Sequence, residues 1–179
     1  CNAILSIVGN ITDDEVLRLC DKWFSPIQKV TVIKRNLPRE PVQTEKRTIR
    51  VERDVPFDMI CLAYHMGPRM NDDYYATDLL SDVLSAGNSS RLYNRLVKEK
   101  QLFSELDAYI TGDVDTGLFV FSGKLMQGVN MEVAEAAIQE EINKVRQKKI
   151  SEKEHKKVIN YVRSSIEFSN ISTLNRALK

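Results

Sequence analysis

The sequence predicts an α+β fold in which a mixed or antiparallel sheet is covered on one face by helices. Short segments in which apolar and polar residues alternate come in consecutive pairs, residues 47–53 with 57–65 and residues 104–111 with 118–125. Longer segments between and after these pairs repeat their apolar residues at helical spacing. A parallel sheet would require strict alternation of strand and helix, so the paired strands favour this class.

Length and charge limit the domain count and the classes of partner. A chain of 179 residues is enough for one ordinary domain, so we predict a single domain over residues 1–179. The net charge of +1 gives no overall field that would hold nucleic acid or an anionic membrane. The apolar stretches are shorter than the roughly 20 residues of a membrane-spanning helix. Three cysteines without C-x-x-C spacing leave the cellular compartment open.

Both ends of the sequence indicate a fragment of a longer, two-domain chain. It begins at Cys1 without an initiator Met, and its apolar periodicity is still running at Lys179. The apolar run Asn2–Gly9 predicts a buried strand. A capping box, Thr12-Asp-Asp-Glu, then predicts a helix from about residue 13 to residue 24. Residues 25–45 contain three prolines among charged residues, which favours an extended connection.

The second half of the chain predicts four more helices around a hairpin. Two aspartates and two glycines between residues 112 and 117 favour a turn that joins the strands 104–111 and 118–125. Apolar spacing and cap residues predict the helices at about 72–85, 89–98 and 131–148, with a last long helix from Ser151.

One segment comes close to a metal motif. Ser151-Glu-Lys-Glu-His155 differs at one position from H-x-x-E-H, in which two histidines one helical turn apart bind zinc. Because Ser151 replaces the first ligand, the chelating pair is missing, whereas Ser151-x-x-Glu154 is a complete capping box. We therefore predict a helix cap and no metal site. We expect His65, at a strand end, to be a packed or hydrogen-bonded residue and not a ligand.

No nucleotide-binding loop and no nucleophile motif occurs in the sequence. The residues by themselves therefore define an α+β domain without a visible active site.

A resemblance extends this interpretation. Three features follow one another along the chain. They are an apolar strand with an acidic helix cap at residues 2–15, a small-residue turn with S-S-R-L at residues 84–96, and V-K-E-K-Q-L at residues 97–102. Their order and spacing resemble those of the pitrilysin, insulysin and mitochondrial-processing-peptidase family of zinc peptidases. Gly117-Leu-Phe and the paired last helices match the same layout. The chain resembles the second, inactive peptidase domain, a half-unit of a processing-peptidase-like metallohydrolase.

The resemblance implies a role in binding peptide. Family members are built from two homologous halves that face each other across a chamber, and the first half usually holds the zinc. In many relatives the second half offers an arginine and, seven positions later, a tyrosine that hydrogen-bond the substrate backbone. The corresponding positions are Lys98 and Glu105, so the charge is kept but the planar guanidinium and the phenol are lost.

Two functions follow as alternatives. The chain is the non-catalytic, substrate-binding half of a zinc metalloendopeptidase, with zinc in a homologous partner half. Alternatively, it is a structural or protein-interaction module that has lost peptidase activity, as in core subunits of respiratory complexes. An intact H-x-x-E-H upstream in the parent gene would favour the first.

Overall fold

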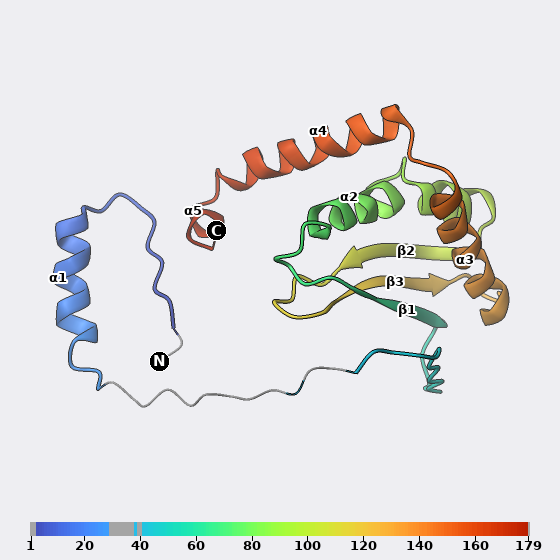
Figure 1. The fold of residues 1–179 in the computed structure, drawn as a ribbon, viewed down its shortest axis with the longest axis horizontal. Coiled ribbons are helices and arrows are strands. Elements are labelled where there is room, and N and C mark those ends of the chain that lie inside the picture. The colour runs from blue at the N-terminus through green and yellow to red at the C-terminus, as the bar shows by residue number, and fades with distance from the viewer. Residues whose placement is uncertain (1–2, 29–37, 39–40, 179) are drawn as a thin grey trace. The chain divides into compact units, whose positions relative to one another are not determined.

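The computed structural model describes residues 3–28, 38 and 41–178. Nine elements follow one another along the described chain (Figure 1). They are α1 (Asp13–Phe24), β1 (Met59–Met66), α2 (Tyr74–Ser85), η1 (Tyr93–Glu99), β2 (Phe103–Ile110), β3 (Gly117–Leu125), α3 (Met131–Gln147), α4 (Glu152–Ser169) and α5 (Thr173–Ala177).

The chain forms two compact units, which are described separately. Unit 1 comprises Cys1–Val51 with Ser164–Lys179, and unit 2 comprises Glu52–Arg163. The single domain that the chain length predicts stays a prediction. No helix in the described part of the chain is long and apolar enough to cross a membrane.

Unit 2 is built on a three-stranded antiparallel sheet in the order β1-β3-β2. The central strand β3 pairs with both neighbours, so that Gly123 lies opposite Ile60 on one side and Leu106 on the other. The hairpin predicted from the turn residues is β2 and β3, which start and end within one residue of the expected positions. The predicted α+β class is therefore confirmed, with an antiparallel sheet.

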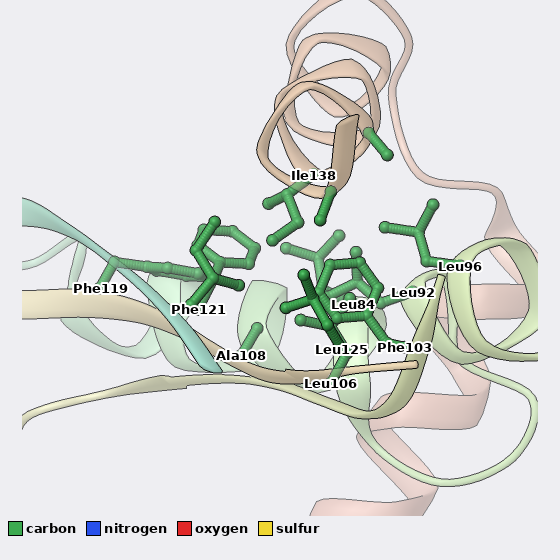
Figure 2. Close-up of a cluster of buried hydrophobic side chains, with 13 residues drawn as sticks. Leu84, Leu92, Leu96, Phe103, Leu106, Ala108, Phe119, Phe121, Leu125 and Ile138 are labelled. Atoms are coloured by element: carbon green, nitrogen blue, oxygen red, sulfur yellow. The ribbon is translucent and has the colours of Figure 1, made fainter. Parts of the chain in front are cut away.

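The two faces of this sheet differ in chemistry because side chains alternate along a strand. On the inner face, Phe119, Phe121 and Leu125 of β3 pack beneath Ile138 of α3 (Figure 2). Leu84 of α2 joins the same cluster, so α2 and α3 cover this one face. The outer face is defined by these residues: Met59, Cys61, Ala63 and His65 of β1, Glu105, Asp107 and Tyr109 of β2, and Leu118, Val120, Ser122 and Lys124 of β3.

Hydrogen bonds extend the inner packing to the rim of the sheet. The hydroxyl of Tyr64 donates to Oε1 of Gln139 on α3 at 3.0 Å, and its ring meets the ring of Phe121 edge-on. At the other edge of the sheet, Ser85 at the end of α2 donates to the carbonyl of Ala108 in β2 at 2.7 Å. Both helices are thus fixed to the sheet by polar as well as apolar contacts.

Two predicted strands, one from an apolar run and one from alternation, are not formed by the described residues. Of the predicted strand at Asn2–Gly9, Asn2 lies outside the described residues, and residues 3–8 have no regular structure and are mostly exposed. Residues 47–53 are likewise irregular and exposed. An extended segment becomes a strand only when a neighbour accepts and donates its backbone hydrogen bonds, and the described residues place no strand beside either segment.

The short helix predicted at residues 89–98 is present but wound differently. Residues 93–99 form a π-helix, η1, and the amide of Lys100 donates to the carbonyl of Arg95, five residues back, at 2.9 Å. Leu92 and Leu96 are both fully buried in the core. Apolar periodicity identifies the buried face of a helix but does not distinguish 3.6 residues per turn from a wider winding.

Gly123 provides a test of the packing. A methyl group at this position would lie 2.8 Å from side-chain atoms of Leu106 and of Phe103, which are both buried. We expect Gly123→Ala to lower the free energy of unfolding by about 1–3 kcal/mol, because buried side chains must move to admit it. In the matched control Gly9→Ala, nothing lies within 4 Å of the added methyl group. Urea denaturation should show a change within about 0.5 kcal/mol for the control, and equal effects would contradict the packing.

Candidate functional site

The structure places Lys98 and Glu105 on either side of the connection between η1 and β2. Lys98 is exposed in the last turn of η1, and Glu105 is exposed on the outer face of the sheet. The described residues show no hydrogen bond or ion pair that joins Lys98 to Glu105. The two side chains therefore lie near one connection in the chain without forming a pair.

The backbone between them is fixed. The amide of Leu102 donates to the carbonyl of Leu96 at 2.9 Å, and the amide of Met126 donates to the carbonyl of Leu102 at 3.0 Å. Gln101 adopts a φ of 49°, in the left-handed region that favours glycine. This backbone conformation and the two hydrogen bonds set the start of β2 directly after η1.

Glu105 is already engaged on the outer face. Its Oε2 accepts from Nζ of Lys124, its cross-strand neighbour on β3, at 2.6 Å. The same ammonium lies 5.6 Å from the centre of the Phe57 ring. Because both charged side chains are well exposed, at 55% and 38%, the pair adds little stability.

The structure confirms that Ser151 and Glu154 form a helix cap. The amide of Glu154 donates to Oγ of Ser151 at 3.2 Å, while the Glu154 carboxylate accepts from the amide and the hydroxyl of Ser151, each at 2.8 Å. His155 lies exposed in the first turn of α4. No group of histidines, cysteines and carboxylates suited to hold a metal ion occurs among the described residues.

Sequence reasoning missed the partner of that cap. Nε and Nη2 of Arg91, the arginine of the S-S-R-L segment, donate to the two carboxylate oxygens of Glu154 at 2.6 and 2.9 Å. The Arg91 guanidinium and the Ser151 groups lower the pKa of Glu154 to about 2. The S-S-R-L and S-x-x-E patterns are recognisable in the sequence, but their separation of 63 residues gives no signal that they meet.

A polar pocket of about 610 Å³ lies beside this ion pair, between η1, the end of α3 and the start of α4. Three of its cations are paired: Arg91 with Glu154, Arg95 with Glu99, and Lys144 with Glu141. Its one buried hydroxyl without a partner, Ser90 Oγ, is out of contact with solvent. The pocket is therefore lined by ion-paired side chains where η1, α3 and α4 of unit 2 meet.

Three solved structures similar to this chain are of proteases or of protease domains. A protease from Helicobacter pylori has a TM-score of 0.90 and 25% sequence identity, and the match covers 95% of this chain and 42% of that one. The inactive peptidase domain of a putative zinc protease from Bordetella parapertussis has a TM-score of 0.61 and 20% identity, covering 67% of this chain and 65% of that one. A putative zinc protease from Bordetella pertussis Tohama I has a TM-score of 0.59 and 21% identity, covering 65% and 64%.

These similarities define the class as a peptidase-fold domain, and the chain spans less than half the length of the H. pylori protein. No curated protein sequence matches the chain. Residues 2–162 match the family described as the Peptidase M16 inactive domain. Because this match spans most of the sequence, the chain belongs to that family. The resemblance to zinc peptidases of the processing-peptidase type is thereby confirmed.

The cap at the start of α4 predicts a measurable loss of stability. Ser151→Ala removes the acceptor of the Glu154 amide and a donor to the Glu154 carboxylate, so we expect unfolding to become easier by about 1 kcal/mol. His155→Ala, in the same exposed turn, is the control and should stay within about 0.5 kcal/mol. Thermal midpoints that do not move for Ser151→Ala would show that the cap contributes nothing.

The Arg91–Glu154 pair predicts a pH dependence. Since the pKa of Glu154 is lowered from 4.5 to about 2 in the folded protein, its stabilising contribution is complete above pH 4.5 and is lost as the pH falls toward 2. Arg91→Met should therefore destabilise at pH 6, by about 2 kcal/mol for a charged hydrogen-bonded pair. The difference from the unmodified protein should shrink between pH 4.5 and 2.

The control for this measurement is Lys156→Met, which breaks the exposed Lys156–Glu152 pair of the same helix. Its effect should stay below about 0.5 kcal/mol at pH 6. Urea titrations at a series of pH values provide the comparison. A constant difference between Arg91→Met and the unmodified protein down to pH 2 would rule out the ion pair as its source.

Proposed function

We propose that this chain is the non-catalytic, substrate-binding half of a zinc metalloendopeptidase. Catalytic zinc would be held by a homologous partner half, in the same polypeptide or on another chain. Membership of the Peptidase M16 inactive domain family supports a non-catalytic role for this half. The observation that carries the binding role is the exposure of two side chains on either side of the η1–β2 connection, Lys98 in the last turn of η1 and Glu105 on the outer face of the sheet.

Lys98 supplies a cation that is available to a peptide. It is exposed, and no hydrogen bond or ion pair engages it among the described residues. Its ammonium group can donate to a substrate carbonyl, which orients the peptide and draws electron density from that carbonyl. An ammonium is a point charge on a flexible stem, so it holds the backbone less rigidly than the forked guanidinium of an arginine would.

Glu105 supplies the complementary acceptor. A carboxylate cannot donate as a phenol does, but it accepts from a backbone amide or from a basic side chain. To do so it must exchange Lys124 for the peptide, and the exposure of this pair makes that exchange inexpensive. Lys98 and Glu105 together thus offer one donor and one acceptor to an extended peptide backbone.

Zinc chemistry is assigned to the partner half. When bound there, the metal would polarise the scissile carbonyl and activate water. The described residues of this chain offer no ligand cluster for it. The contribution of this chain is to bind and orient the peptide, which raises turnover because the reacting groups are held in place.

One observation favours a second function, that of a structural or protein-interaction module. The Glu105–Lys124 pair satisfies both charges without any peptide, as a purely structural surface would. The two functions differ in their dependence on Lys98, for which the described residues show no hydrogen-bond or ion-pair partner.

The test is Lys98→Ala in the two-half enzyme, which is this chain together with the zinc-bearing partner half. We expect turnover of a peptide substrate to fall by about tenfold while KM changes little, because the lost interaction acts mainly in the transition state. Lys98→Arg should retain or exceed the original rate. Steady-state kinetics give both values.

The control is Lys153→Ala, which removes an exposed lysine from the first turn of α4. It should leave kcat and KM unchanged. Unchanged kinetics for both Lys98 variants would remove Lys98 from the site and favour the structural module.

A further inference from the structure

Residues 144–157, which form the corner between α3 and α4, concentrate the positive charge of the chain (Figure 1). Of the 26 basic and 25 acidic residues in the sequence, seven basic and two acidic residues lie in this corner, so the rest of the chain is net acidic. Both acidic residues already have partners, because Glu152 pairs with Lys156 and Glu154 pairs with Arg91. The corner therefore keeps an excess of positive charge although the whole chain is nearly neutral.

Two lysines of this corner are available to a ligand. Lys148 and Lys149 directly follow the last turn of α3, and both are exposed. Among the described residues, no hydrogen bond or ion pair engages either ammonium group. Helix α4 begins three residues after Lys149, and the backbone amides at its start add a partial positive charge to that of the lysines. The charge of both lysines is thus open to an incoming carboxylate.

The same two lysines line the polar pocket of about 610 Å³ that lies beside the Arg91–Glu154 pair. This volume is within the range of about 300–1,000 Å³ that is usual for ligand pockets. Side-chain amides and hydroxyls, which donate and accept hydrogen bonds, form another part of the lining: Ser89, Asn94, Gln147 and Ser151. The pocket thus combines cations with groups that suit a polypeptide backbone.

The mixed lining favours an acidic polypeptide over a small inorganic anion. The carboxylates of Glu99 and Glu141 also line the pocket, and they would repel a densely charged group such as phosphate. An acidic segment of polypeptide carries its carboxylates one or more residues apart. It can therefore place them on Lys148 and Lys149 while its neutral backbone lies against the remaining lining.

We propose that this pocket binds an acidic segment of a partner polypeptide, whose side-chain carboxylates pair with Lys148 and Lys149. The segment that fits is extended and rich in glutamate or aspartate, with small polar residues between them. The site includes neither Lys98 nor Glu105, so the inference goes beyond the proposed function and does not depend on it.

Fluorescence anisotropy with two labelled hexapeptides tests the binding. The probe repeats glutamate and serine, and its neutral control repeats glutamine and serine. The 179-residue chain should bind the acidic peptide roughly tenfold more tightly than the neutral one, because only the acidic peptide can pair with the lysines. Raising the salt concentration from about 50 to about 200 mM should weaken the acidic complex several-fold, since salt screens exposed charges.

Three matched variants locate the binding in the pocket. Lys148→Ala and Lys149→Ala should each weaken the acidic complex by about threefold, as expected for one exposed charge pair, and the double variant by about tenfold. The control Lys153→Ala removes an exposed lysine of α4 that has no partner among the described residues and does not line the pocket. It should leave the affinity unchanged. All variants should keep the Tm of the unmodified chain, because none of these lysines is buried.

Three outcomes would overturn the proposal. Absence of binding, or equal binding of the two peptides, would show that the lysines attract no acidic segment. An equal loss for Lys153→Ala would assign the binding to the general charge of the corner and not to the pocket. Displacement of the acidic peptide by an equal concentration of inorganic phosphate would make this a site for a small anion and not for a polypeptide.

Discussion

The fold of unit 2 depends on the inner face of β3. This strand pairs on both sides, so it sets the register of β1 and β2, and its Phe119, Phe121 and Leu125 form the surface on which α2 and α3 pack. Gly123 belongs to the same face, and its missing side chain leaves room for Phe103 and Leu106 of the neighbouring strand. One alternating segment thus fixes both the sheet and the position of its helices, because neighbouring side chains on a strand point to opposite faces.

Ion pairs fix the positions of helices that apolar packing alone would not fix. The Arg91–Glu154 pair holds the start of α4 against the segment that leads into η1, and Lys100 and Lys144 both bind Glu140 on α3. The two lysines lower the pKa of Glu140 to about 2. Apolar contacts tolerate many orientations, whereas a bidentate guanidinium pair requires one, so the ion pair selects a single placement of α4 within unit 2.

The residues that stabilise unit 2 lie apart from those proposed to bind peptide. The inner face of the sheet forms the core, and ion pairs join η1, α3 and α4. The last turn of η1 and part of the outer face carry exposed side chains that lie outside the core, among them Lys98 and Glu105. The proposed function uses these side chains to hold a peptide while another half performs the chemistry.

The sequence by itself determined the α+β class, the β2–β3 hairpin, the Ser151 cap and the family, because each depends on residues close together in the chain or on a motif with fixed spacing. Only the tertiary structure decided that η1 is a π-helix, that Arg91 meets Glu154, and that Glu105 is paired with Lys124. These outcomes depend on contacts between distant segments, which local patterns do not specify. The apolar run at residues 3–8 shows the same limit, since a pattern can mark a strand but cannot supply the neighbour that completes it.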